Sequence, residues 1–283
     1  MPELLARIRA MRRSAAEALA SVLHDTRNQD PNEVELRDAW HARLAADPTT
    51  CAEGWYMPPP HGIVLALDTS PRFERLQTPT FRPESTWPST QRHLADGSLL
   101  SVYCSRVHRA TGAIGDIGCS LYRGTDPALR NHLHNIWRAT SRIAEEVRLG
   151  IAFRQLYGRA MEILREHNLV NDIYSTHDGS QTNIGHTVPW SYETIRRNER
   201  LVLAGGSPQQ VADLVSGRRR FISPTETLEI TQDMVLTIEP RPRRPGLPPA
   251  WFHLVVGFER GRRIIVTEFE PLFETYDMQY LGA

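Results

Sequence analysis

The sequence has little cysteine, no long apolar run and no excess of charge of either sign. Its three cysteines, Cys51, Cys104 and Cys119, are widely spaced and form no Cys-x-x-Cys pair, which argues against a disulfide framework and a thiolate zinc site. The chain has no run of about 18 apolar residues that could cross a bilayer. Its N-terminus also lacks the apolar segment of a signal peptide. We therefore expect free thiols, no membrane partner and a cytoplasmic location.

Charge and length limit the class of protein further. The 33 acidic and 33 basic residues give a formal net charge of zero, so no electrostatic attraction to a polyanion is expected, and we predict no nucleic-acid partner. A chain of 283 residues can bury a sizeable core. We expect a single domain that spans residues 1–283.

Hydrophobic periodicity predicts a mixture of helices and strands. Helical spacing of apolar residues is found over 3–24, from about 31 onward, over 127–148 and over 151–168. Strands are predicted over 98–107 and 113–123, joined by a turn at 111–112, and over 233–239, 251–258 and 262–267. The proline-rich segment 48–95 indicates irregular β structure, and the polar segment 204–226 indicates turns. This order is typical of an α+β domain with helices on one face of a curved antiparallel sheet.

Five short segments, in order along the chain, carry a family resemblance. They are DGSLLSVY (96–103), DIGCSLYRG (116–124), HTVP (186–189), DMVLTIEP (233–240) and VVGFERGRRIIV (255–266). In this order they resemble the motifs of the methionine aminopeptidase, prolidase and creatinase family. The resemblance implies the pita-bread fold, a curved antiparallel sheet covered by helices, in one catalytic-type domain. Because the first predicted helix begins within about the first five residues, we expect no separate N-terminal domain of the kind usual in the family.

The resemblance also shows which metal-ligand positions have changed. The family's two-metal site uses two aspartates, a histidine and two glutamates, because two neighbouring cations need anionic ligands. The carboxylate positions fall on Tyr103, Asp116, Glu239 and Phe252, so two anionic ligands are missing. The ligand histidine falls on position 179, a glycine. We therefore expect no metal pair and no cofactor, although a single weakly held ion stays open.

Four residues are candidates for catalysis. His186 falls at the family's substrate-side histidine, where an imidazole can exchange a proton with the leaving nitrogen. Glu239 and Asp116 are expected to face one cavity, where one of two neighbouring carboxyls acquires a raised pKa. His177, in a polar loop, is a further candidate acid or base. Each has a structural alternative: a histidine that is exposed or stabilises its loop, or a carboxylate bonded to an arginine. The arginines at 218–220 are typical of a solvated face.

Five more residues are candidates for binding a substrate. Tyr103 and Phe252 stand where the family has carboxylate ligands, so each either contacts the substrate or fills the vacated volume. His61, after three prolines, and His253, beside the lost glutamate, could bind substrate or serve as hydrogen-bonded structural residues. Arg241 could hold a substrate carboxylate through two parallel hydrogen bonds, with a solvated face as the alternative.

Together these features favour a metal-independent enzyme with a small-molecule substrate. It would cleave or rearrange a C–N bond of an amino-acid-like or amidine-like substrate, by acid–base catalysis with histidine and carboxyl groups. The alternatives are a metal-dependent aminopeptidase or proline dipeptidase, and a non-catalytic peptide-binding module. A homodimer is a further hypothesis that rests on family analogy alone.

Overall fold

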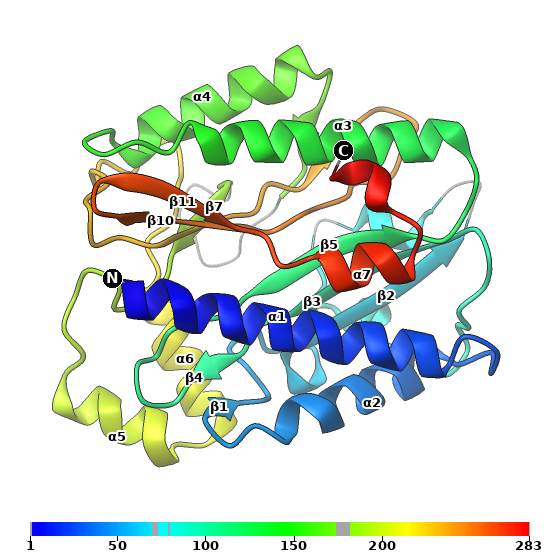
Figure 1. The fold of residues 1–283 in the computed structure, drawn as a ribbon, viewed down its shortest axis with the longest axis horizontal. Coiled ribbons are helices and arrows are strands. Elements are labelled where there is room, and N and C mark those ends of the chain that lie inside the picture. The colour runs from blue at the N-terminus through cyan, green and yellow to red at the C-terminus, as the bar shows by residue number, and fades with distance from the viewer. Residues whose placement is uncertain (1, 70–72, 79, 174–181, 283) are drawn as a thin grey trace.

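Seven helices and eleven strands position the candidate site in the computed structural model, which describes residues 2–69, 73–78, 80–173 and 182–282 (Figure 1). The helices in this part of the chain are α1 (Pro2–Asp25), α2 (Glu33–Ala45), α3 (Pro127–Glu145), α4 (Phe153–Glu166), α5 (Arg197–Gly205), α6 (Pro208–Arg218) and α7 (Glu270–Thr275). The strands are β1 (Thr50–Cys51), β2 (Ile63–Thr69), β3 (Ser98–Cys104), β4 (Val107–His108), β5 (Ile117–Tyr122), β6 (Val170–Asn171), β7 (Gly185–Thr187), β8 (Leu236–Ile238), β9 (Pro242–Arg243), β10 (Leu254–Glu259) and β11 (Arg262–Val266).

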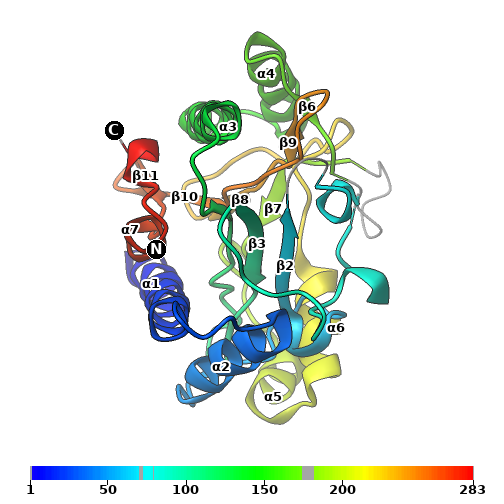
Figure 2. The same cartoon turned by 90° about the vertical axis from the view of Figure 1, so that its right-hand side faces the viewer.

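The central strands form a curved antiparallel layer (Figure 2). One sheet has the order β2-β3-β5 and another the order β11-β10-β8-β7. The residues just before β10 connect the two, because Phe252 bridges Cys119 of β5 and the amide of His253 donates to the carbonyl of Gly118 at 2.8 Å. The antiparallel pairing of β3 with β5 confirms the hairpin expected from the sequence.

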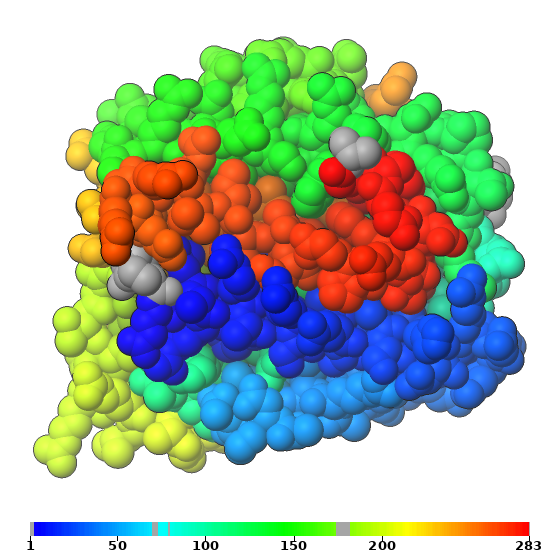
Figure 3. Space-filling view, in the orientation of Figure 1, coloured from blue at the N-terminus to red at the C-terminus, as the bar shows by residue number. Residues whose placement is uncertain are grey.

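Helices cover this layer with apolar faces. In α3, the buried apolar residues follow helical spacing and are Leu129, Leu133, Ile136, Ala139, Ile143 and Ala144. Helices α3 and α4 lie together along one side, and α1 runs beneath the C-terminal strands and α7 (Figures 1 and 3). None of the helices described has the length and apolarity needed to cross a membrane. The architecture confirms the expected α+β class.

The segment 204–226 was expected to consist of turns, and this prediction is wrong. It contains the end of α5 and the whole of α6. The side chain of Ser207 caps α6 by accepting from the amide of Gln210, and Pro208 occupies the first turn. In this helix only Val211, Ala212 and Val215 are buried. Such a sparse apolar stripe gives a weak periodic signal, which explains the wrong prediction.

Arginine supplies every basic side chain, since the sequence contains no lysine. A guanidinium group has five N–H donors in a fixed fork, so one arginine can satisfy several carbonyls. Fully buried Arg12 of α1 donates to the backbone carbonyls of Asp116, His253 (2.6 Å) and Thr267 (2.7 Å). It thereby ties α1 to the residues just before β5, just before β10 and just after β11.

Replacing Arg12 with methionine should destabilise the protein strongly. The variant leaves three buried carbonyls without their donor, and each unsatisfied group costs about 1–3 kcal/mol. We expect the free energy of unfolding in urea to fall by about 3 kcal/mol or more. The control is Arg9→Met in the same helix. The half-exposed guanidinium of Arg9 pairs with Glu268, so its loss should lower the free energy of unfolding by less than about 1 kcal/mol. Equal losses in the two variants would contradict this role for Arg12.

Candidate active site

The ends of neighbouring strands bring four titratable side chains together. Asp116 directly precedes β5, Glu239 follows β8, His186 lies in β7 and His253 precedes β10. Strands β7 and β8 come unusually close at Gly185, which has φ 142°. A Cβ atom there would lie 1.8 Å from the carbonyl oxygen of the facing strand, so only glycine fits. This close approach places His186 beside Glu239.

The side-chain atoms of this cluster converge on one small volume. The Nε2 atom of His186 lies 3.3 Å from Oε1 of Glu239 and 3.8 Å from Oδ2 of Asp116. His253 completes the cluster, with its Nδ1 atom 3.4 Å from Oε2 of Glu239. The Nδ1 atom of His186 is 3.0 Å from the carbonyl oxygen of Thr187, which can only accept. Nδ1 therefore carries the hydrogen, and in the neutral ring the Nε2 lone pair faces the two carboxyls.

Burial controls the protonation of the cluster. Asp116 is fully buried and Glu239 keeps only 12% of its side chain exposed. Burial raises the pKa of Asp116 to about 7, although the indole N–H of Trp55 donates to its Oδ1 atom at 2.8 Å. Burial and the neighbouring charge of Asp116 raise the pKa of Glu239 to about 8. Burial and Arg219 hold the pKa of His186 well below its usual value. Near neutral pH both protonated and ionised carboxyls are therefore present, beside a neutral imidazole.

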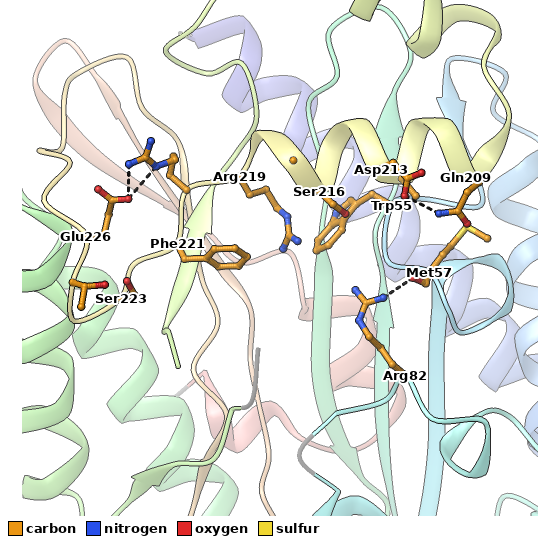
Figure 4. Close-up of a pocket in the computed structure, with 14 residues that line it drawn as sticks. Trp55, Met57, Arg82, Gln209, Asp213, Ser216, Arg219, Phe221, Ser223 and Glu226 are labelled. Carbon is orange, nitrogen blue, oxygen red and sulfur yellow. Dashed lines mark hydrogen bonds and ion pairs between the residues drawn. The ribbon is translucent and has the colours of Figure 1, made fainter. Parts of the chain in front are cut away.

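Of the positive charges around this cluster, Arg219 has the largest effect on the pKa values of Asp116 and Glu239. Its guanidinium stacks over Trp55 at 3.8 Å and over Phe221 at 4.9 Å from the ring centroids, and only 8% of the residue is exposed (Figure 4). Burial lowers the pKa of Arg219 to about 10, so it stays charged at neutral pH, and Glu239 and Asp116 counteract that shift. No carboxylate of the described residues lies within the 4.0 Å ion-pair distance of Arg219.

A pocket of about 600 Å³ adjoins the cluster (Figure 4). Trp55, Arg219 and Phe221 belong both to its lining and to the surroundings of His186, whose ring lies 5.6 Å from Trp55 and 6.0 Å from Phe221. Arg82 also lines the pocket and stacks over Tyr56. The pocket is therefore lined by two aromatic rings, Trp55 and Phe221, and by three guanidinium groups, of which that of Arg220 pairs with Glu226.

Tyr103 joins the cluster, as expected. Its ring packs edge-on against His253 at 5.3 Å and against Trp55 at 6.5 Å. Burial and then the charges of Asp116 and Glu239 hold the pKa of Tyr103 well above its usual value. Its phenol therefore stays protonated and can act as a hydrogen-bond donor.

Phe252 and His253 point to opposite sides of their strand. The ring of Phe252 packs edge-on against Trp137 at 5.3 Å, within an aromatic cluster outside the site. The imidazole of His253 faces the cluster, because a Cβ atom on Gly118 would lie 2.8 Å from its Nδ1. Of this pair the site contains His253, and Phe252 fills the core on the other face.

Two other expected residues lie elsewhere, and a third cannot be placed. The guanidinium of Arg241 donates to backbone carbonyls in the segment 76–78, which uses its donors for structure. The ring of His61 stacks on His41 with centroids 3.9 Å apart. His177 lies outside the described residues. Arg241 and His61 therefore lie outside the cluster that contains Asp116.

The sequence analysis missed Arg219 and Trp55. Arg220 is exposed and pairs with Glu226, whereas Arg218 is partly buried and pairs with the buried Glu199. Arg219 lies between them in extended backbone, φ −79° and ψ 140°, where alternate side chains point to opposite sides. The run of arginines therefore contained a signal for the inward direction of Arg219, because side chains alternate in direction where the helix ends and extended backbone begins. Trp55 follows a two-residue strand and had no comparable local signal.

The fold and site together define a class of protein. A curved antiparallel sheet flanked by helices, with acids and imidazoles at its centre, is the pita-bread architecture. The chain belongs to metallopeptidase family M24, whose profile matches residues 6–268. No curated protein sequence matches the chain.

Solved structures of similar fold include peptidases of three kinds. The X-Pro aminopeptidase from Thermotoga maritima MSB8 has a TM-score of 0.61 and 13% identity, with 94% of this chain and 61% of that chain covered. The methionine aminopeptidase from Rickettsia prowazekii has a TM-score of 0.60 and 13% identity, covering 94% and 98%. The prolidase from Pyrococcus furiosus has a TM-score of 0.57 and 16% identity, covering 91% and 63%. This chain thus spans about three fifths of the first and third of these proteins.

The donor set fits one divalent ion and not the pair that the family name implies. Ligand atoms of Asp116, His186 and Glu239 lie within 4.8 Å of one another. Oδ2 of Asp116 and Nε2 of His186 are buried without a hydrogen-bond partner, as converging ligand atoms would be. Two carboxylates cannot offset the charge of two cations beside the guanidinium of Arg219. One cation is the most that this charge balance supports.

The stability of the metal-free protein should fall as the pH rises. Glu239 has a pKa of about 8 in the folded chain against a reference value of 4.5. Protonation of Glu239 therefore stabilises the folded state, and this stabilisation is complete below pH 4.5 and is lost as the pH approaches 8. With chelator present, Glu239→Gln should flatten the loss, which is at most about 1.4 kcal/mol per pH unit for one group. Urea unfolding at several pH values measures this, with exposed Glu17→Gln as control. A slope that Glu239→Gln leaves unchanged would refute the assigned protonation.

Proposed function

We propose that this chain is a hydrolase that cleaves a C–N bond of a small amino-acid-like substrate by acid–base catalysis, without a metal pair. The observation that carries the proposal is the convergence of two buried carboxyls of raised pKa on Nε2 of His186, which lies 3.3 Å from Glu239 and 3.8 Å from Asp116. The charge of buried Arg219 opposes the rise in both pKa values. A fixed positive charge there lets one carboxyl ionise while the other keeps its proton. An acid and a base are then present together near neutral pH.

The residues can complete a hydrolysis with balanced protons. Glu239 has a pKa of about 8, and the fraction of it that is ionised takes a proton from water as the water oxygen bonds to the substrate carbonyl carbon. The same carboxyl then gives a proton to the nitrogen as the C–N bond breaks, leaving a carboxylic acid and an amine. Nε2 of His186 lies 3.3 Å from Oε1 of Glu239, where it could accept a hydrogen bond once Glu239 is protonated and reoriented. Tyr103 and Arg219 stabilise the negative charge that develops on the carbonyl oxygen.

The pocket favours a substrate with an anionic group. Arg82, Arg219 and Arg220 line it together with the acids Asp213 and Glu226. Arg220 pairs with Glu226, whereas neither Arg82 nor Arg219 pairs with an acid among the residues described. Two guanidinium groups attract a carboxylate and repel a cation, so the amidine-like substrate considered from the sequence is disfavoured. The rings of Trp55 and Phe221 offer apolar contact for a side chain. We therefore propose an N-acyl amino acid or short peptide with a free carboxylate.

A second candidate function uses a single divalent cation held by Asp116, His186 and Glu239. The observation that favours it is the orientation of His186, whose Nδ1–H is fixed by the carbonyl of Thr187. This arrangement is typical of metal-binding imidazoles, and it leaves Nε2 buried and unpartnered. When bound, such an ion polarises a carbonyl and lowers the pKa of its water.

Turnover of dipeptides and N-acyl amino acids by the purified chain tests both candidates. In chelator, the wild type should remain active, and Glu239→Gln should lower kcat by about 100-fold or more. Glu259→Gln, at the end of β10, is the matched control. Activity that disappears in chelator and returns with Mn²⁺ would favour the single-ion candidate. A Glu239→Gln enzyme as active as the wild type would exclude both, and binding of peptides without turnover would indicate the non-catalytic module.

Arg82→Gln should weaken binding of the substrate carboxylate without affecting the chemical step. A charge-assisted hydrogen bond contributes about 1.5–3 kcal/mol, so KM should rise by about 10- to 100-fold at similar kcat. The effect should vanish for the corresponding substrate amide. Arg220→Gln is the control, because Arg220 lines the same pocket but is paired with Glu226. A fall in kcat alone would show that Arg82 does not bind the carboxylate.

A further inference from the structure

A second group of metal-ligating side chains lies outside the candidate active site. It consists of His41 of α2, Glu53 after β1, and His61 in the turn before β2. One ligand atom of each lies within 4.8 Å of the others. The imidazoles stack with centroids 3.9 Å apart, and Nε2 of His41 is 3.9 Å from Oε1 of Glu53. That distance is too long for a hydrogen bond, so the three groups converge without bonding to one another.

The backbone holds two of these side chains in register. Gly62 has φ +64°, and a Cβ atom there would lie 2.2 Å from the carbonyl oxygen of Glu53. The turn at 61–62 therefore packs directly on the backbone of Glu53. His61 itself has φ +60°, a left-handed conformation that non-glycine residues adopt at a cost of about 1–3 kcal/mol. The fold thus maintains a costly conformation that fixes His61 beside Glu53.

The polar atoms of the cluster are incompletely satisfied. The Nε2 atom of His41 is buried and has no hydrogen-bond partner. Glu53 accepts a weak bond from the thiol of Cys51 at 3.7 Å through its Oε2 atom. The side chains of His41 and Glu53 are 19% and 33% exposed, so an ion can reach them from solvent. An unpartnered imidazole nitrogen facing a carboxylate is an arrangement that a cation would satisfy.

We propose that His41, Glu53 and His61 form a binding site for zinc, or a divalent ion of similar preference, with water as the fourth ligand. Two imidazoles and one carboxylate are a known ligand type for Zn²⁺, whereas Mg²⁺ and Ca²⁺ prefer oxygen alone. Zinc bonds of about 2.0–2.2 Å in tetrahedral geometry need ligand atoms roughly 3.4 Å apart. The stacked rings must rotate before their nitrogen lone pairs can converge at that spacing.

The site would join α2 to the segment that supports the active site. Glu53 precedes Trp55 by two residues, and the indole of Trp55 donates to Asp116. An ion shared with His41 and His61 therefore fastens both ends of the 53–61 segment to the helix. Binding to the folded chain alone stabilises it in proportion to the ion's concentration relative to Kd. The role is structural and independent of the reaction proposed above.

Zinc titration of the metal-free chain tests this site apart from the first one. The background is Asp116→Asn with Glu239→Gln, which removes the carboxylates of the candidate active site. We expect calorimetry to show one zinc bound per chain in this background, and the thermal midpoint to rise with zinc. Adding His41→Gln and His61→Asn should weaken binding by more than about tenfold and remove the rise. Asparagine is chosen at 61 because it tolerates positive φ.

His24→Gln is the matched control, an exposed histidine at the end of α1, and should leave zinc binding unchanged. Circular dichroism without zinc must show the same helix content in all variants, so that lost binding reports lost ligands. The proposal fails if the background binds no zinc. It also fails if the His41→Gln and His61→Asn changes leave its affinity and thermal shift as they were.

Discussion

Two carboxyl groups buried side by side are the constraint on which the centre of this protein depends. Charges removed from water are costly, and two like charges at close range are costlier still. Asp116 and Glu239 meet that cost through raised pKa values and through the charge of buried guanidinium groups, that of Arg219 for both acids and that of Arg12 for Asp116. The balance allows one ionised and one protonated carboxyl near neutral pH. It opposes the two cations that a full family ligand set would accommodate.

The fold holds this balance in place with few side chains. Arg12 ties the carbonyls of Asp116 and His253 to α1, so β5 and β10 cannot move away from α1 without leaving these acceptors unpaired. Gly185 lets β7 approach β8 closely enough to place His186 against Glu239. These interactions are made by residues distant in sequence. They fix the site before any ligand binds.

The order of motifs was enough to predict the α+β class, the pita-bread fold and the acids Asp116 and Glu239, because each acid adjoins a strand with a recognisable pattern. The location of Arg219 could not be predicted, since its inward direction depends on where α6 ends. Likewise, the choice between Phe252 and His253 depends on strand register, which alternation alone leaves open. A single domain, a homodimer and a cytoplasmic location stay predictions, because neither the fold nor the comparisons bear on them.

The central claim is that Arg219 supplies the positive charge that balances the two acids. Titration of the metal-free chain with Mn²⁺, an ion that prefers carboxylates, tests it most directly when wild type and Arg219→Gln are compared. Without the guanidinium the acids should bind Mn²⁺ at one site, at least about tenfold more tightly than the weak binding predicted for the wild type. Two tightly bound ions in the wild type, or equal affinity in both proteins, would contradict the account.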